Sequence, residues 1–234
     1  METCLVWHRR DLRVADNPAL NYAAQNADII IPVVCIEEAI CASESPGNAS
    51  VLTTQFKLEC IADLRSQYRK LGSDLLVRVG TPEEILPRLA REIQATLLVY
   101  SKAHTQREVD RENEVCGILR MAGITTVGYW DDLLVDRASL PFELEHLPQD
   151  FSEFQQMMIE PFKNIPLPLV SPTQLPSCPL KVDLLPTLES LGFSAGATSN
   201  QPKRSFRGGT TEAMERVRSY IWNGGGLVEY VKAR

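Results

Sequence analysis

The sequence predicts an α/β protein with a doubly wound, Rossmann-like sheet of five parallel strands. Short apolar or β-branched runs recur along the first 135 residues, and helical periodicity separates each run from the next. The runs are continuously apolar rather than alternating, which is typical of parallel strands covered by helices on both faces. The expected strands are residues 4–7, 29–36, 74–79, 97–100 and 124–129.

The first two expected helices have clear signals at their ends. The first begins at Asn17-Pro18, a capping residue followed by a residue whose fixed φ suits the first helical position. The second ends at Gly72, which readily takes a left-handed conformation. Its inward stripe is expected to consist of Leu52, Phe56, Cys60, Leu64, Tyr68 and Leu71.

Two more helices complete the expected α/β unit. Thr81-Pro82 starts the third in the same manner as the first, and its inward residues are expected to be Ile85, Leu86, Leu89 and Ile93. The fourth is expected over residues 106–121, before Gly123. We therefore predict an α/β domain over residues 1–135 that folds alone.

The rest of the chain has a different character. Eight prolines lie between residues 161 and 202, too many for regular helices, so residues 136–209 are expected to form an extended connector. A terminal helix and tail follow over residues 210–234. The helix is expected at residues 210–222, with Met214, Val217 and Ile221 on one face beside Tyr220 and Trp222, and the glycines at 224–226 end it.

Composition and charge limit the classes of partner. The longest apolar stretch, residues 29–36, is far shorter than the ~20 residues of a membrane helix, so no membrane association is expected. The net charge of -6 argues against a free-standing nucleic-acid binder. We interpret the basic residues between 201 and 218 as a solvated face rather than a phosphate-contacting patch.

The cysteines and the first residues indicate a reducing compartment. The six cysteines, Cys4, Cys35, Cys41, Cys60, Cys116 and Cys178, form no C-x-x-C pair and are interpreted as reduced, buried thiols. Residues 1–3 lead straight into the first strand, so we expect a cytoplasmic protein, or a chloroplast protein if a transit peptide has been removed.

A long motif identifies a family resemblance. Residues 6–20 read V-W-H-R-R-D-L-R-V-A-D-N-P-A-L, and further matches follow in the same order at residues 75–80, 82–84, 130–132, 140–142 and 208–213. The chain resembles the N-terminal α/β domain of the photolyase/cryptochrome family. The last two stretches resemble DASH-type cryptochromes most.

This resemblance implies two cofactor sites, of which only one would lie in the α/β domain. The family's catalytic flavin is held by a C-terminal helical domain, whose phosphate cradle and tryptophan chain have no counterpart in these 234 residues. We therefore expect no FAD and no catalysis by this chain alone, because the cofactor carries that chemistry. The family's antenna chromophore, such as the folate methenyltetrahydrofolate, would bind instead at the carboxyl ends of the strands.

The expected antenna crevice has residues from three strand ends. They are Trp7, His8, Arg9 and Arg10 after the first strand, Cys35, Ile36, Glu37 and Glu38 after the second, and Ser101, Lys102 and His104 after the fourth. Folate-binding relatives carry a glutamate after the fourth strand. An ungapped alignment from Tyr100 puts His104 at that place, whereas a gapped alignment puts Glu108 there.

Several of these residues also have a purely structural interpretation. Arg10, Asp11 and Arg13 are expected to form a network that fixes the first turn, and Asp16 and Asn17 to cap a helix. Trp7 and Trp130 are expected in the core. His104 and His146 are expected in solvent, because three histidines without ligand spacing do not form a metal site.

Three function classes stay open at this stage. The first class is a non-catalytic photolyase-like module that binds a chromophore or nucleotide. The second is an interaction module that docks on a helical flavin domain or on a second copy of itself. The third class is a FAD-dependent DNA photolyase or DASH cryptochrome of which this chain is one piece.

Overall fold

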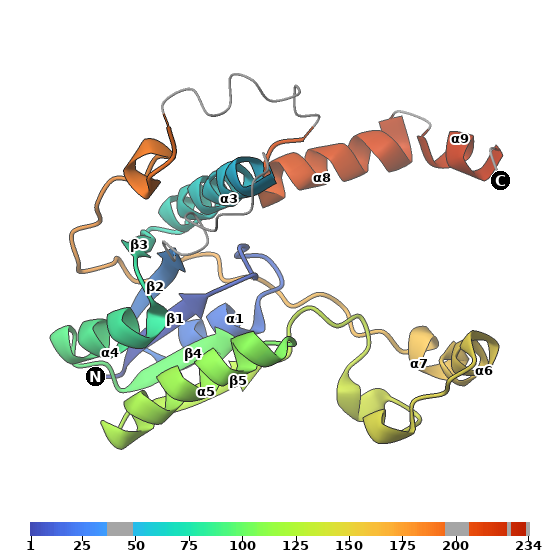
Figure 1. Cartoon of the computed structure of the whole chain (residues 1–234), viewed down its shortest axis with the longest axis horizontal. Coiled ribbons are helices and arrows are strands. Elements are labelled where there is room, and N and C mark those ends of the chain that lie inside the picture. Colours follow the sequence, from blue (N-terminus) through green and yellow to red (C-terminus); the bar gives the residue numbers. More distant parts are fainter. Residues whose placement is uncertain (37–48, 195–205, 224–225, 233–234) are drawn as a thin grey trace.

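The protein is an α/β sandwich with an irregular arm, as its computed structural model shows (Figure 1). The structure describes residues 1–36, 49–194, 206–223 and 226–232. The five strands are β1 (Thr3–His8), β2 (Ile29–Ile36), β3 (Leu76–Val79), β4 (Leu97–Ser101) and β5 (Thr125–Tyr129). The helices around them are α1 (Pro18–Asn26), α3 (Ala49–Lys70), α4 (Pro82–Glu92) and α5 (Gln106–Met121).

The sheet is entirely parallel, with the order β3-β2-β1-β4-β5. Strand β1 pairs with β2 on one side and with β4 on the other, so the direction of winding reverses at β1. This confirms the doubly wound fold. A crevice for ligands is therefore expected beyond His8, at the carboxyl end of β1.

Two apolar cores lie on the two faces of the sheet. Helices α1 and α3 cover one face, where Leu20, Leu64 and Tyr68 are fully buried. Helices α4 and α5 cover the other face with residues such as Leu86 and Leu119. Strand side chains alternate between the two cores, which explains why the three central strands, β2, β1 and β4, are buried along almost their whole length.

Helix α1 begins as the sequence predicts, but the stripe on α3 differs from the expectation. The Asn17 side chain accepts a hydrogen bond from the Leu20 N–H at 2.9 Å and caps α1. On α3, Leu64 and Tyr68 are buried, whereas Cys60 is half-buried and Phe56 is 45% exposed. With 22 residues α3 is about 33 Å long, longer than the strands beneath it. Its first turns therefore extend past the sheet.

The arm after β5 is irregular, with short helical pieces, and it is anchored to the α/β unit. The pieces are η1 (Arg137–Ser139), η2 (Leu144–His146), α6 (Phe151–Met157), α7 (Ile159–Lys163) and η3 (Glu189–Leu191). Leu175 and Leu191 are buried in the core under α3, and the Leu175 N–H donates to the Leu71 carbonyl at 2.8 Å. The Asp16 carboxylate, expected to be a helix cap, instead accepts the Leu169 N–H at 2.8 Å. The independence of residues 1–135 stays a prediction.

The terminal helix has nearly the extent that the sequence predicts, but its end is π-helical and a further helix follows it. Helix α8 (Thr210–Arg218) continues as a π-helical segment, η4 (Ser219–Asn223), and is followed by α9 (Gly226–Lys232). Its start is fixed on α3, because the Gly208 N–H donates to Glu59 at 2.8 Å and the Thr211 hydroxyl donates to Asp63 at 2.6 Å. Beyond this anchor α8 extends past α3 (Figure 1).

Two remaining expectations concern cysteines and membranes. Five cysteines of the described part of the chain form no disulfide, with Cys4 and Cys116 buried and Cys35, Cys60 and Cys178 half-buried. Cys41 lies outside the described residues. Within the described ranges, no helix is both long enough and apolar enough to cross a membrane.

Candidate functional site

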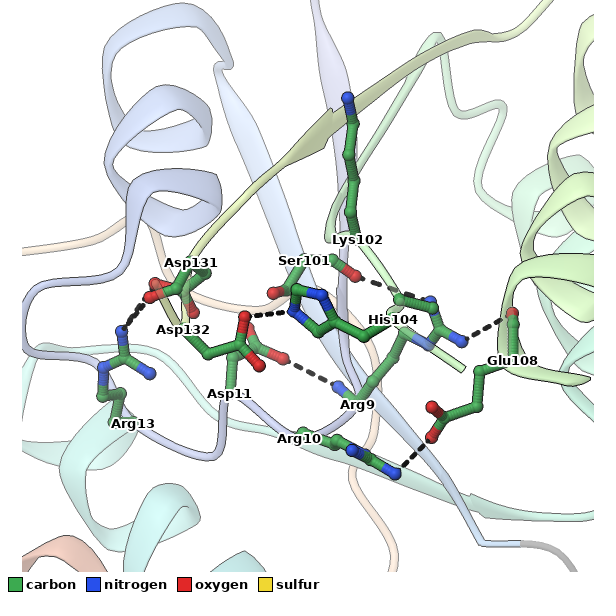
Figure 2. A pocket seen from close by; sticks show the side chains of 11 residues that line it. Arg9, Arg10, Asp11, Arg13, Ser101, Lys102, His104, Glu108, Asp131 and Asp132 are labelled. Carbon is green, nitrogen blue, oxygen red and sulfur yellow. Dashed lines mark hydrogen bonds and ion pairs between the residues drawn. The ribbon is translucent and has the colours of Figure 1, made fainter. Parts of the chain in front are cut away.

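Two pockets lie side by side at the carboxyl edge of the sheet, and they share a wall. The main pocket has a volume of about 660 Å³, within the range of ligand sites. Its lining is Trp7, His8, Arg9, Arg10, Leu12, Arg13, Cys35, Thr53, Phe56, Lys57, Cys60, Pro82, Glu108, Arg111, Gly209, Thr210 and Ala213. The side pocket, of about 50 Å³, is lined by Arg9, Arg10, Asp11, Arg13, Ser101, Lys102, Ala103, His104, Glu108, Asp131 and Asp132 (Figure 2).

Arg9 is the centre of the shared wall. Its guanidinium donates to Glu112 at 2.7 Å and to the Glu108 carbonyl at 3.0 Å, and it lies 4.6 Å from the ring of Trp7. Because Glu112 neutralises it and its side chain is only 13% exposed, Arg9 positions the wall rather than offering a free charge. Arg10 is different, since its side chain is 66% exposed while it pairs with Glu108 at 3.0 Å. Arg10 therefore does not belong to the network that fixes the first turn.

Glu108 lies between the two pockets, and His104 lies in one of them. Glu108 is in the first turn of α5, where it accepts hydrogen bonds from the Thr105 hydroxyl at 2.6 Å and from Arg10. Burial raises the pKa of this carboxyl, but Thr105, Arg10 and Arg9 outweigh it and lower the pKa below its usual value. His104 follows β4 and pairs with Asp132. Only the residue of the gapped alignment, Glu108, therefore faces both pockets.

His8 lines the main pocket but has no ring nitrogen left for a ligand. Its Nδ1 lies 3.0 Å from the Asp11 carboxylate and its Nε2 lies 2.6 Å from the Tyr68 hydroxyl. Asp11 is buried and also accepts hydrogen bonds from the Arg9 N–H and the Asn17 amide. Burial raises the pKa of Asp11, but His8 and these donors outweigh it and lower the pKa to about 2. An ionised Asp11 accepts the Nδ1 proton of His8, and in the neutral form of His8 the Nε2 then accepts from Tyr68.

Asp131 is the unsatisfied group of the side pocket. Arg13 donates to its Oδ1 at 2.5 Å, whereas its Oδ2 is buried without a hydrogen-bond partner. Burial raises the pKa of Asp131 to about 6, although the charge of Arg13 acts in the opposite direction. In Figure 2 the carboxylate lies beside Arg13 and Asp132, at the end of β5. A buried carboxylate oxygen of this kind can accept an N–H from a ligand.

Trp130 is not a core residue, contrary to the expectation, whereas Trp7 is. Trp7 is buried, but Trp130 is half-buried with the Lys102 ammonium and the Arg137 guanidinium over its ring at 5.3 and 4.9 Å. The His104 ring lies 5.0 Å from the same indole, so this histidine is partnered rather than simply solvated. Trp130 follows the edge strand β5, where the helices no longer cover the sheet. His146 is exposed, as expected.

The predicted site residues divide between the pockets. Trp7, His8 and Cys35 line the main pocket, Ser101, Lys102 and His104 line the side pocket, and Arg9, Arg10 and Glu108 line both. Ile36 is buried in the sheet and lines neither, because its side chain points into the core under α3. Glu37 and Glu38 lie outside the described residues. The binding role of all these residues stays a prediction.

The site also contains residues that sequence reasoning missed. Phe56 and Lys57 reach the main pocket from the overhanging start of α3, and Thr210 reaches it from α8. These three residues meet in the pocket only because segments that are distant in sequence contact each other. Asp131 and Asp132 were visible as two acids after the fifth strand. Among the described residues, no cluster of three histidine, cysteine or acidic side chains could hold a metal ion.

The family of the chain follows from comparison with known proteins. The family model described as DNA photolyase matches residues 4–173. The chain belongs to the DNA photolyase family. Cryptochrome DASH of Gloeobacter violaceus is 32% identical over 236 residues, which cover 100% of this photolyase-family chain and 47% of that relative. The blue-light photoreceptor PHR2 of Arabidopsis thaliana is 32% identical over 223 residues, covering 92% of the chain and 49% of the relative.

Solved structures agree with this assignment. The crystal structure of the Synechocystis sp. PCC6803 cryptochrome matches with a TM-score of 0.87 at 30% identity, covering 100% of this chain and 49% of that one. This photolyase-family chain thus corresponds to the N-terminal α/β module and is most similar to DASH cryptochromes, as the sequence motifs predict. It spans about half the length of the curated relatives that it matches.

Proposed function

We propose that this photolyase-family module is an antenna unit, which binds a planar, conjugated and anionic chromophore of the folate or flavin class in the main pocket. The observation that carries this proposal is the composition of that pocket. Aromatic and apolar side chains such as Phe56 and Leu12 offer a surface for a ring, while Arg10 and Lys57 offer charges for a carboxylate or phosphate. The pocket also lies at the carboxyl ends of β1 and β2, beside the switch point of the sheet, where such folds bind ligands.

The residues present fit such a group in a specific way. Phe56 would contact the ring system, and Arg10 would hold an anionic tail at the solvent-exposed side. Glu108 is the acceptor that would receive a ring N–H group at the shared wall. The chromophore would supply light absorption, and the chain would orient it and exclude water.

A binding titration tests this proposal. The chain is titrated in the dark with flavin mononucleotide and, separately, with methenyltetrahydrofolate, and binding is followed by fluorescence polarisation. Phe56→Asp should weaken binding about tenfold, which is ~1.4 kcal/mol. It removes the aromatic contact with the ring system of the ligand, and its carboxylate repels the anionic ligand. Phe151→Asp is the matched control, since Phe151 is 74% exposed on α6. Saturable binding absent for both ligands, or equal in both variants, refutes the antenna proposal.

A second candidate function, docking through the terminal helices, has its own observation. The described part of α8, η4 and α9 leaves an unusual number of large apolar side chains exposed, namely Met214, Val217, Tyr220, Ile221, Trp222, Leu227, Val228 and Tyr230. An apolar surface of this size is typical of an interaction site. We propose that a helical flavin domain covers it, either in the same longer protein or as a separate chain. A second copy of this chain is the alternative occupant.

Sedimentation and thermal unfolding distinguish these occupants. If copies pair through this face, Val217→Asp combined with Ile221→Asp should reduce the apparent mass, because charges would be buried in the interface. If the face is instead covered by the same chain, these substitutions should lower the melting temperature. Val170→Asp, at an 89% exposed position of the arm, is the control. If neither quantity changes, neither a second copy nor a part of this chain covers the face.

FAD-dependent DNA photolyase or DASH cryptochrome activity is proposed only for a protein that also carries the helical domain. The coding sequence beyond residue 234 tests whether such a domain follows. The location is likewise a proposal: cytoplasmic, or chloroplast, because DASH relatives of Arabidopsis thaliana and Oryza sativa are named chloroplastic/mitochondrial. A fluorescent fusion of the complete gene product would separate the two.

A further inference from the structure

A buried tyrosine, a histidine and an aspartate form a continuous hydrogen-bonded triad behind the main pocket. The Tyr68 hydroxyl lies 2.6 Å from His8 Nε2, and His8 Nδ1 lies 3.0 Å from the Asp11 carboxylate. With the proton of a neutral His8 on Nδ1, Tyr68 donates to Nε2 and Nδ1–H donates to Asp11. All three side chains are almost inaccessible to water. Neither nitrogen of His8 is free to bind a ligand, so the antenna proposal does not explain the role of this triad.

The triad favours movement of a proton from Tyr68 to His8. Burial, and then the negative charge of Asp11, raise the pKa of Tyr68 well above its usual value, so the phenol keeps its proton in the resting protein. The hydroxyl lies 2.6 Å from His8 Nε2, which is an acceptor when the imidazole carries its proton on Nδ1. If His8 took that proton, it would become an imidazolium next to the ionised Asp11, which would stabilise it. A tyrosine whose proton has such an acceptor is easier to oxidise, because the electron and the proton leave together.

The position of the triad couples it to the main pocket. His8 lines this pocket, and its ring packs edge-on against the Tyr68 ring with centroids 5.6 Å apart. Tyr68 is therefore one side chain removed from a ligand in the pocket. It also lies on α3, the helix whose residues Phe56 and Cys60 form another wall of the pocket.

We propose that Tyr68 is a redox-active tyrosine, which donates one electron to a photoexcited flavin-type chromophore in the main pocket while its phenolic proton passes to His8 Nε2. This inference rests on the proposed antenna function for its oxidant. The chromophore takes up the electron, Tyr68 becomes a neutral phenoxyl radical, and His8 becomes an imidazolium paired with Asp11. Return of the electron and of the proton restores all three groups. The expected role is to protect the module by quenching the excited chromophore.

The test uses the full chain with two oxidants. The first is flavin mononucleotide, whose dark binding is measured beforehand, and the second is an external ruthenium photo-oxidant that needs no binding site. After a laser flash, transient absorption and freeze-quenched electron paramagnetic resonance detect a neutral tyrosyl radical. Tyr68→Phe should lose this radical with both oxidants, whereas Tyr22→Phe, at a half-buried tyrosine on α1, should retain it. In the unsubstituted chain the radical should form more slowly in D₂O.

His8→Gln separates the proton transfer from simple packing, because an amide oxygen accepts the Tyr68 hydrogen bond but cannot take its proton. Its radical yield should fall while circular dichroism stays unchanged; if this variant does not fold, the D₂O comparison decides the same point. A radical that persists in Tyr68→Phe, or that shows no D₂O effect, overturns the inference and leaves the triad a packing element. Failure of flavin binding refutes the antenna function, and the ruthenium experiment then decides the redox role of Tyr68 by itself.

Discussion

Replacing Asp131 with asparagine should remove a pH-dependent contribution to the stability of the protein. Burial raises the pKa of Asp131 from 3.8 to about 6, so the folded state binds its proton more tightly than the unfolded state does. The resulting stabilisation is fully present below the ordinary pKa and is lost as the pH rises through 6. A shift of about 2 pKa units corresponds to at most about 3 kcal/mol. Between about pH 7.5 and about pH 5, linkage gives a gain of about 1.4 kcal/mol.

Urea unfolding at these two pH values measures that gain. The free energy of unfolding of the unsubstituted protein should rise on acidification by about 1.4 kcal/mol more than that of Asp131→Asn. Asp183→Asn is the control, because this carboxylate is 71% exposed and pairs with Arg78, which stays protonated, rather than with a histidine. The comparison cancels the titration of the groups that both proteins share. Equal pH dependence in Asp131→Asn and in the unsubstituted protein would show that the carboxyl is not held in a desolvated position.

Further predictions concern the arm and its anchors. Leu175→Ala should destabilise the protein by about 2–4 kcal/mol in urea, because it opens a cavity under α3, whereas Leu184→Ala, at a 94% exposed position, should not. Gly208→Ala should speed hydrogen exchange in α8, since a Cβ would lie 2.3 Å from the Phe56 carbonyl, while Gly117→Ala meets nothing within 4 Å. Limited proteolysis should cut the arm before the domain at residues 1–135; cleavage of that domain first would contradict the proposed boundary.

The order and the type of the α/β elements could be predicted from local signals. Continuous apolar strands, the cap at Asn17 and the fourth helix over residues 106–121 all match the structure. These features depend on neighbours in the chain, such as a side-chain oxygen that reaches an N–H three residues later. The terminal helix was less predictable, because its π-helical segment and the second helix α9 have no comparable local signal.

The candidate site was predictable only as a region. The rule for strand ends located Trp7, Arg9 and Ser101 correctly at the carboxyl edge. It did not show that this edge holds two pockets, because the wall between them depends on the guanidinium of Arg9 reaching Glu112 on a distant helix. It also counted His8 as available to a ligand.

The sequence by itself determined the family, the doubly wound sheet and the edge at which ligands meet it, because these depend on hydrophobic periodicity and on a long contiguous motif. Only the tertiary structure decided which of the polar side chains are free. His8 is fully engaged by Tyr68 and Asp11, whereas one oxygen of Asp131 has no partner. The physical reason is that a hydrogen bond joins groups at about 3 Å in space. Tyr68 is 60 residues from His8 and Arg13 is 118 residues from Asp131, separations that no local pattern records.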